Sequence, residues 1–451
     1  MYWANFLHIY QPPTQKEIWV RRITSESYRK LFSGLLKIKR ARFTLNINGV
    51  LCDFLERYGG QDVLDNINKL LKAGNLELTG SAKYHAFLPL LPASEIERQI
   101  LLNEVSLKKY FGDHWQKSGF FSPEMGYSKK VAEAATKLGY RWLIMDEIGF
   151  PAGHRFSPDR NYQIKGLEDF SVFFRERAAS FKISGAQLGG HKVIISHHGE
   201  RVKKNEYVVT AMDGEIFGHH RPGLETVLFD LYQELAIEPA TISDLQRHFP
   251  AVDVVEPREC TWAATKQDLK NNEPFARWQR PDNAVQVRQW QLTEMALAIV
   301  SRDKQKSLRE RMDAALHSDQ YWWASVRPWW SLEMIERGAY ALKNIILDST
   351  AATRQEKEKA EELYKQIIYT GFEWQRSGYV DDLSRAQDEE IQQQLEEKEK
   401  FFITKEDYQQ MIKIIEEQMQ VAAKNQEYHR AAMIQDRIRE LREDLQKQHG
   451  V

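Results

Sequence analysis

Residues 206–220, EYVVTAMDGEIFGHH, constrain the fold of this chain more than any other stretch. Their first part, residues 207–212, is a nearly uninterrupted apolar run of strand-forming side chains, which is typical of a parallel strand buried on both faces. Titratable side chains follow at its end: Asp213, Glu215, His219 and His220. A capping residue at a strand-to-helix turn would account for a single Asp. Two carboxylates and two imidazoles in so short a segment favour an active site, because active sites of β/α folds lie at the carboxyl ends of their strands.

Strand signals alternate with helical signals over the first 260 residues. We expect about eight strands, namely those at residues 2–8, 43–47, 76–80, 140–145, 170–174, 192–196, 207–212 and 252–255, besides a short one that begins at residue 119. This alternation predicts a parallel sheet with right-handed crossovers. Polar groups recur where the strands end: His8, Glu77, Glu124, Asp146 and Asp213. That recurrence favours a closed or nearly closed β/α barrel over an open sheet. Ser94 and Glu97 predict a capping box for a long helix that ends near Tyr110.

The chain changes character after Trp262, where strand signals disappear. Amphipathic helices are predicted at residues 283–300, 304–315 and 332–347, and a tryptophan-rich segment at 320–330 interrupts them. We expect some of these tryptophans to reach the cleft of the first domain. From residue 386 the chain is highly charged, and it ends in two helices with apolar stripes that predict a helical hairpin. The predicted domains are therefore a barrel at 1–265, a helical domain that completes the cleft at 266–384, and a charged linker with the hairpin at 385–451.

The composition argues against several classes of function. The 63 Lys and Arg residues nearly balance the 64 Asp and Glu residues, so nothing favours a nucleic-acid or membrane-surface partner. Cys52 and Cys260 lie far apart, which makes a disulfide framework improbable and fits a reducing compartment. No apolar run reaches the roughly 20 residues that cross a bilayer, and the N-terminus lacks the features of a signal peptide. We therefore expect a soluble, cytoplasmic protein.

Two carboxyl groups at strand ends suit the chemistry of glycosidic bonds. Cleavage or transfer of such a bond needs one carboxyl group to protonate the departing oxygen and a second to attack the anomeric carbon or activate water. Glu124 and Asp213 qualify, because each ends a predicted strand and precedes a glycine-containing turn. A metal site is the competing interpretation, with ligands from His8, His85, His219, His220 and the acidic residues, but no pair has the HExxH spacing. The GxSxG elbow, the GxGxxG motif and the P-loop are absent, so we expect no metal and no cofactor.

Four segments appear in a fixed order: HIYQP at residues 8–12, LELTG followed by Tyr84-His85 at 76–85, SPEMGY at 122–127, and TAMDGEIFGHH at 210–220. Together they resemble the motifs of glycoside hydrolase family 57, which comprises α-glucan-active amylases, glucanotransferases and branching enzymes. The similarity extends over about residues 1–345. Tyr10 departs from the pattern, since the first motif of the family has a second His at that position.

The resemblance implies a (β/α)7 barrel capped by a helical domain, and a retaining mechanism without a metal. Glu124 would then be the nucleophile and Asp213 the general acid/base. The residues that would bind the sugar are His8, Gln11, Glu77, His85, Glu215, His219, His220, Trp262 and Trp323. The implied substrate is an α-glucan oligosaccharide or polysaccharide, and the implied enzyme is of the α-amylase, 4-α-glucanotransferase or branching type.

Two other functions stay open at this point. The first is a carbohydrate-binding or regulatory protein that keeps the barrel without turnover, and the second is a metal-dependent deacetylase or mannosidase-like enzyme. The last 40 residues or so separately resemble the UVR (UvrB/UvrC) motif, through YHRAAMIQDRI at 428–438. That motif implies a hairpin for contacts with a protein partner. The sequence leaves hydrolysis or transfer, linkage preference and oligomeric state undetermined.

Overall fold

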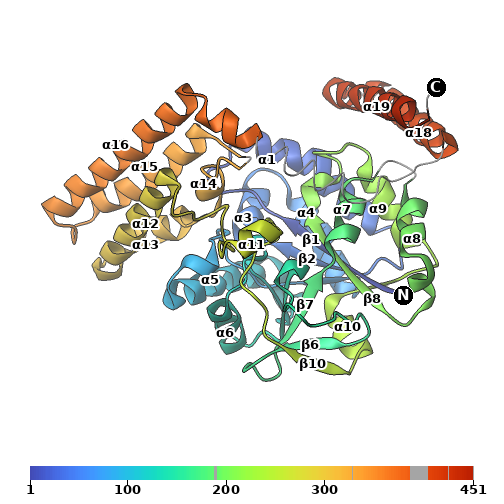
Figure 1. Cartoon of the computed structure of the whole chain (residues 1–451), viewed down its shortest axis with the longest axis horizontal. Coiled ribbons are helices and arrows are strands. Elements are labelled where there is room, and N and C mark those ends of the chain that lie inside the picture. Colours follow the sequence, from blue (N-terminus) through green and yellow to red (C-terminus); the bar gives the residue numbers. More distant parts are fainter. Residues whose placement is uncertain (187–189, 328, 386–404, 425, 450–451) are drawn as a thin grey trace.

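The computed structural model describes residues 1–186, 190–327, 329–385, 405–424 and 426–449. Figure 1 shows three regions, namely a barrel of strands and helices, a domain of long helices on one side of it, and a C-terminal helical hairpin. The linker predicted at 386–404 lies outside the described residues. Among the residues described, no helix is both long and apolar enough to cross a membrane.

Seven parallel strands of the described chain form a ring in the order β8-β1-β2-β3-β4-β5-β7. Their bounds are β1 (Tyr2–Ile9), β2 (Phe43–Ile47), β3 (Leu76–Leu78), β4 (Gly119–Phe121), β5 (Trp142–Asp146), β7 (Ser171–Arg175) and β8 (Tyr207–Asp213). The backbone of Gly80 joins β3 to β4 with two hydrogen bonds of 2.9 Å. The N–H of Glu176 joins β7 to β8 by donating to the carbonyl of Val209 at 2.8 Å. The ring confirms the predicted (β/α)7 barrel.

Three further strands lie outside the ring: β6 (Asn161–Ile164), β9 (Glu238–Ala240) and β10 (Val252–Val255). β6 pairs antiparallel with β7 and parallel with β10, and β9 pairs with β1. The prediction of a strand at 192–196 is wrong, because α8 (His191–His198) occupies that segment. Its apolar run is short, and the two buried residues Ile194 and His198 lie four positions apart, which is the period of a helix.

The helices of the barrel region cover the outside of the ring (Figure 1). Their bounds are α1 (Glu17–Ile23), α2 (Arg29–Leu35), α3 (Gly49–Arg57), α4 (Gln61–Lys72), α5 (Ala93–Phe111), α6 (Lys129–Lys137), α7 (Arg177–Ser184), α9 (Leu224–Gln233) and α10 (Ile242–His248). Single turns are η1 (Thr24–Tyr28), η2 (Leu88–Leu90), η3 (Gly112–His114), η4 (Pro123–Met125), η5 (Glu147–Gly149), η6 (Gly199–Lys203) and η7 (Gly214–Ile216). The predicted capping box at Ser94 is wrong, because α5 begins one residue earlier, after Pro92, with no side-chain cap. Pro92 takes the N-cap position with an extended ψ of 149°, and its lack of an N–H removes no helix hydrogen bond there.

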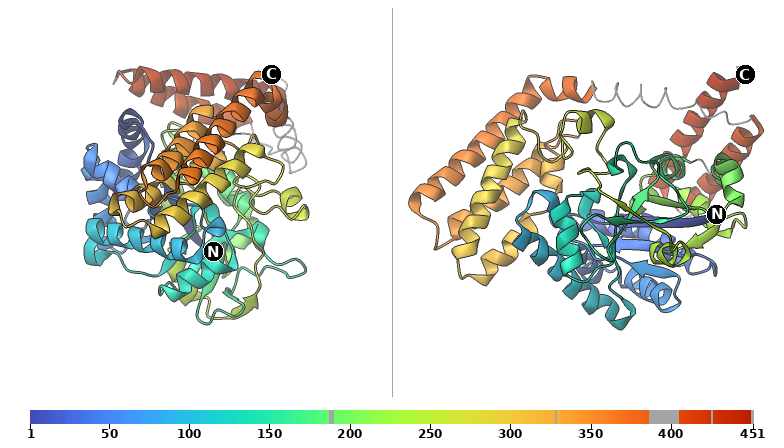
Figure 2. Two further views of the ribbon diagram at one scale, coloured as in Figure 1. Left: turned by 90° about the vertical axis from the view of Figure 1, so that its left-hand side faces the viewer. Right: turned by 60° about the horizontal axis from the view of Figure 1, so that its bottom comes forward.

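The helical domain consists of α11 (Lys266–Lys270), α12 (Ala284–Arg302), α13 (Lys306–Ala315), α14 (Asp319–Trp322), α15 (Leu332–Asp348) and α16 (Arg354–Arg376). Its apolar faces share one hydrophobic cluster with the helices around β4 and β5. The domain is therefore packed on the barrel through a continuous core. The right-hand view of Figure 2 shows the long helices gathered on one side of the barrel.

The C-terminal hairpin is formed by α18 (Lys405–Lys424) and α19 (Tyr428–His449), as the apolar stripes predict. Tyr408, Ile415, Ile434, Ile438 and Leu441 are buried and belong to the same hydrophobic cluster as β1, β2 and α9. An ion pair of 3.9 Å between Lys30 and Glu427 adds a polar contact with the barrel. The hairpin thus packs on the barrel on the side away from the helical domain (Figures 1 and 2).

Candidate active site

Glu124 follows β4 in a single turn, η4, where its backbone has a φ of 62° and a ψ of 18°. A residue other than glycine rarely adopts this left-handed conformation, and such strain clusters at functional sites. The indole Nε1 of Trp262 donates to Oε2 of Glu124 at 2.7 Å, and the backbone N–H of Trp262 donates to the Glu124 carbonyl at 3.1 Å. The Glu124 side chain keeps 18% of its surface exposed. It is therefore held firmly and yet can be reached from solvent.

Asp213 is the last residue of β8, and the β1–β8 register places it opposite His8. It is partly buried, and among the described residues no group donates a hydrogen bond to its carboxylate. The negative charge of Asp213 raises the pKa of Glu124, so the two carboxyl groups lie within electrostatic reach. The structure brings the two predicted catalytic residues to the same end of the barrel.

Three nearly parallel rings lie beside Glu124. The centroid of the His85 ring is 4.0 Å from that of Tyr10 and 5.0 Å from that of His8, and the rings of Tyr10 and His8 are 6.1 Å apart. Its Nδ1 shares a hydrogen bond of 2.9 Å with Oγ of Ser318 and lies 3.9 Å from Oε1 of Glu124. Burial lowers the pKa of His85 to about 4 and that of His8 well below its usual value. Both rings are neutral at pH 7, and the buried Nε2 of His85 has no hydrogen-bond partner among the described residues.

Asp319 joins this group from the helical domain, and sequence reasoning missed it. The hydroxyl of Tyr10 donates to Oδ2 of Asp319 at 2.7 Å, and Nδ1 of His317 lies 3.1 Å from the same oxygen. Burial raises the pKa of Asp319, but the hydrogen bonds from His317 and Tyr10 and the neighbouring imidazoles outweigh burial and lower it. Its charge also raises the pKa of Glu124. The signal in the sequence is its position directly before the tryptophan-rich segment at 320–330.

Glu215 and Gln11 lie next to the catalytic pair, where they tie two loops together. Oε1 of Glu215 accepts hydrogen bonds from the backbone N–H of Tyr10 at 3.1 Å, from the amide of Gln11 at 3.5 Å and from the hydroxyl of Tyr28. Burial, and then the charge of Asp213, raises the pKa of Glu215 to about 8. Tyr28 lies on η1, one turn of π-helix, and such turns often occur at functional sites.

The structure does not bring Glu77 to the site. This residue lies within β3, where it accepts hydrogen bonds from the hydroxyl of Ser118 at 2.6 Å, the backbone N–H of Ser243 at 3.2 Å and the Ser243 hydroxyl. Ser243 belongs to the first turn of α10, whose N–H groups have no partner within the helix. Glu77 therefore joins the start of α10 to β3 and to the segment just before β4.

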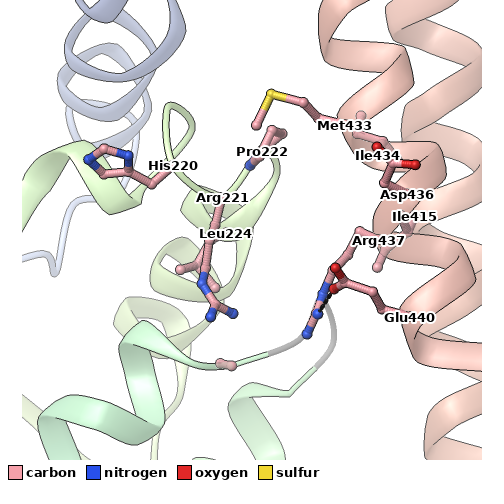
Figure 3. A pocket seen from close by; sticks show the side chains of 11 residues that line it. His220, Arg221, Pro222, Leu224, Ile415, Met433, Ile434, Asp436, Arg437 and Glu440 are labelled. Carbon is pink, nitrogen blue, oxygen red and sulfur yellow. Dashed lines mark hydrogen bonds and ion pairs between the residues drawn. The ribbon is translucent and has the colours of Figure 1, made fainter. Parts of the chain in front are cut away.

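The two histidines after β8 also point elsewhere. His219 forms a contact of 2.6 Å with Glu26. Two backbone hydrogen bonds, from His220 to Glu215 and from Arg221 to Ile216, turn the chain back on itself. His220 is consequently exposed and lines a cavity of about 340 Å³ between the barrel and α19 (Figure 3).

Trp262 and Trp323 occupy different positions relative to the catalytic pair. Trp262 contacts Glu124 directly. Trp323 follows α14 and lies edge-on to Trp329, with ring centroids 5.9 Å apart. It is four positions after Asp319, so it lies on the same side of the helical turn as the carboxylate that contacts Tyr10.

The electrostatics of the pair suit a reaction that needs one acid and one anion. Burial raises the pKa of Glu124 to about 8, against the lowering effect of the Trp262 N–H. Burial raises the pKa of Asp213 to about 6, against the lowering effect of Arg175. The charge of Asp213 raises the pKa of Glu124 further, so near neutral pH the pair holds one proton, on Glu124, and one negative charge, on Asp213. A retaining glycosidase requires the same total but with the proton on the acid/base group, so the proton must pass to Asp213 before Glu124 can attack.

One comparison with known proteins shows the family of the chain. A sequence model described as Glycosyl hydrolase family 57 matches residues 5–257. An α-amylase from Pyrococcus horikoshii is 24% identical over 149 residues, which cover 32% of this chain and 23% of that protein. The chain thus matches about a quarter of the length of this curated relative.

Solved structures show the same fold at low identity. A family 57 branching enzyme from Thermococcus kodakaraensis has a TM-score of 0.61 at 16% identity, over 81% of this chain and 94% of its own. A 4-α-glucanotransferase from Thermococcus litoralis has a TM-score of 0.61 at 16% identity, over 76% and 58%. The α-amylase AmyC from Thermotoga maritima has a TM-score of 0.56 at 14% identity, over 86% and 96%.

Proposed function

The chain belongs to glycosyl hydrolase family 57, and from this premise we propose that it cleaves or transfers α-glycosidic bonds of glucans by double displacement. The observation that carries the proposal is the meeting of Glu124 and Asp213 at one end of the barrel, with the charge of Asp213 acting on Glu124. The printed names of its relatives and structural neighbours, α-amylase, 4-α-glucanotransferase and branching enzyme, supply the substrate class.

In the first step, Glu124 attacks the anomeric carbon and forms a covalent glycosyl ester. The bond from that carbon to the leaving oxygen breaks, and Asp213 gives its proton to the oxygen. In the second step, water or a sugar hydroxyl attacks the same carbon, Asp213 takes the proton, and the ester bond to Glu124 breaks. The N–H of Trp262 supports this assignment, because a hydrogen bond to the carboxylate favours the ionised nucleophile.

Substrate binding is proposed for the groups that line this centre. His85 is proposed to lie against a sugar bound at Glu124, because its Nδ1 is 3.9 Å from Oε1 of that residue. Gln11 and Glu215 shape the floor of the site through their contacts with Tyr28. The cluster of Trp322, Trp323 and Trp329 offers flat apolar faces for sugar rings beside it.

Rescue of two variants with azide tests the roles of the carboxyl groups. An Asp213→Ala enzyme acting on an α-glucosyl fluoride should form the α-glycosyl azide, since azide then replaces the glycosyl ester at Glu124. A Glu124→Ala enzyme should form the β-glycosyl azide, because azide attacks from the vacant side of the nucleophile. The opposite pairing of variants and products would exchange the two roles, and no rescue in either variant would refute the pair.

The acceptor decides between hydrolysis and transfer. Incubation with maltoheptaose should give only shorter products if water is the acceptor, and longer ones as well if a second glucan is. Retention of the unchanged oligosaccharide by the protein would instead support the carbohydrate-binding alternative.

A cytoplasmic location and a partner at the hairpin complete the proposal. Cys52 and Cys260 are free and buried, which suits a reducing compartment. Val421 and Tyr428 on the hairpin expose 57% and 70% of their surface, and such side chains could contact a protein partner.

A further inference from the structure

Arg175 is a buried arginine at the carboxyl end of β7, in the ring of strands that carries the catalytic pair. Its side chain is only 6% exposed, and the β5–β7 register places it opposite Asp146. Arginine is almost never buried to this degree unless it is paired. Its partners therefore indicate what its charge is used for.

The pairing around Arg175 leaves its charge incompletely balanced. Nη1 lies 3.3 Å from Oδ2 of Asp146, which is itself fully buried. The other oxygen of Asp146 accepts from Nε of Arg177 at 2.6 Å, so one buried carboxylate faces two guanidinium groups. Glu147 is exposed, and solvent screens its charge. Nε of Arg175 has no hydrogen-bond partner among the described residues.

Arg175 also has a geometric relation to both carboxyl groups of the proposed pair, because it ends β7, the strand hydrogen-bonded to β8, which ends at Asp213. Its guanidinium carbon is 5.6 Å from the ring centroid of Trp262, and the N–H of that indole donates to Glu124. On the other side, the positive charge of Arg175 opposes the effect of burial on the pKa of Asp213 and lowers it. A single fixed cation thus contacts the ring that orients the nucleophile and acts on the acid/base group.

We propose that Arg175, a buried cation at the strand end next to that of Asp213, is a positioning residue of the double displacement and serves the second step, in which Asp213 takes a proton from the incoming hydroxyl. This inference rests on the proposed function of the Glu124–Asp213 pair. Burial alone would keep the proton on Asp213, which suits the first step only. An acid/base group works best when its pKa lies near the operating pH, and Arg175 brings Asp213 toward that range.

Other ionisable groups share this environment. Those that face Arg175 or Asp213 from the surrounding elements are Tyr28, Glu124, Asp146, Glu147, Arg177 and Glu215. All of them are retained in an Arg175 variant, so a difference from the wild type reports the loss of this one charge.

A carbon-13 NMR titration of the Asp213 carboxyl group tests the electrostatic part, with Asp213→Asn to assign the resonance. The Arg175→Met variant should titrate about 1–3 pH units higher than the wild type, the usual effect of removing one adjacent cation. Arg175→Lys keeps the charge, so Asp213 should titrate near its wild-type pH in that variant, and Arg175→Gln, which also lacks the charge, replaces the Met variant if that protein does not fold. Arg201→Met is the matched control, because Arg201 forms an ion pair of 3.2 Å with Glu176, the residue that follows Arg175. Equal titration of Asp213 in the wild type and the Met variant would overturn the proposal.

Turnover of α-maltotriosyl fluoride tests the catalytic part. Fluoride leaves with little help from an acid, so the second step controls kcat. The assay is run at a fixed pH below the raised pKa of Asp213 in Arg175→Met. There kcat of the variant should fall about tenfold for each unit by which that pKa has risen, while kcat/KM changes little. An equal loss in kcat and kcat/KM at every pH would indicate a structural role only and overturn the proposal. A wild-type protein without turnover would refute the proposed function instead, while the NMR titration would still decide whether Arg175 controls Asp213.

Discussion

Replacing Trp262 with phenylalanine keeps an aromatic ring but removes the N–H that donates to Oε2 of Glu124 at 2.7 Å. A hydrogen bond to a charged group contributes about 1.5–3 kcal/mol. One pH unit corresponds to about 1.4 kcal/mol, so loss of this bond raises the pKa of Glu124 by about 1–2 units. Glu124 is protonated below its pKa and cannot attack. The acidic limb of the pH profile of kcat/KM should therefore move to higher pH by that amount.

The assay measures kcat/KM on a short malto-oligosaccharide between pH 5 and 9. On the acidic limb, kcat/KM of Trp262→Phe should be about 10- to 100-fold lower than that of the wild type, because the pKa of Glu124 rises by about 1–2 units. Trp323→Phe serves as the control, because its indole has no hydrogen bond to Glu124 in the described structure, and its limb should stay in place. An unmoved acidic limb in Trp262→Phe would refute the view that this N–H stabilises the ionised nucleophile.

Three further predictions concern other parts of the site. Tyr10→Phe removes the hydroxyl that donates to Asp319 at 2.7 Å, and kcat/KM should fall about tenfold with unchanged circular dichroism, which corresponds to the weaker end of a hydrogen bond to a charged group; an unchanged kcat/KM would show that this contact is dispensable. Glu77→Ala removes the hydrogen-bond acceptor for Ser243, so the free energy of unfolding should fall by about 1–3 kcal/mol while KM stays unchanged. A raised KM with unchanged stability would indicate instead that Glu77 binds the substrate. Dialysis against a chelator should leave turnover unchanged, because the proposed chemistry uses only carboxyl groups, and loss of activity that zinc restores would favour the metal-dependent alternative.

The sequence predicted the parts of the fold that depend on local pattern. The apolar run before Asp213 forms β8, and the position of each carboxyl group after a strand placed Glu124 and Asp213 at one end of the barrel. Strand ends can be read locally because side-chain periodicity and breaking residues lie within a few positions of one another. The segment at 192–196 shows the limit, since its short apolar run suits a strand or a buried helix equally, and tertiary packing decided for the helix.

The parts that were missed depend on contacts between distant segments. Asp319 meets Tyr10 across 309 positions, and Tyr28 meets Glu215 across 187. Arg175 lies at the end of a strand that the sequence predicted, but its role depends on its contacts with Asp146 and Trp262, which lie on other elements. Glu77 shows the reverse error, because its place near a predicted strand end resembled that of the catalytic residues while its partners lie on α10. Local periodicity carries no information about such pairings.

The contact between Tyr10 and Asp319 has a consequence for how the protein is made. During synthesis the barrel strands emerge first, and they already contain both carboxyl groups of the proposed reaction. The charge of Asp319, which acts on Glu124, is added only after the ribosome has passed residue 319. A nascent barrel is therefore electrostatically unfinished, and the enzyme acquires its complete catalytic environment only when the later helices dock against the strands that preceded them.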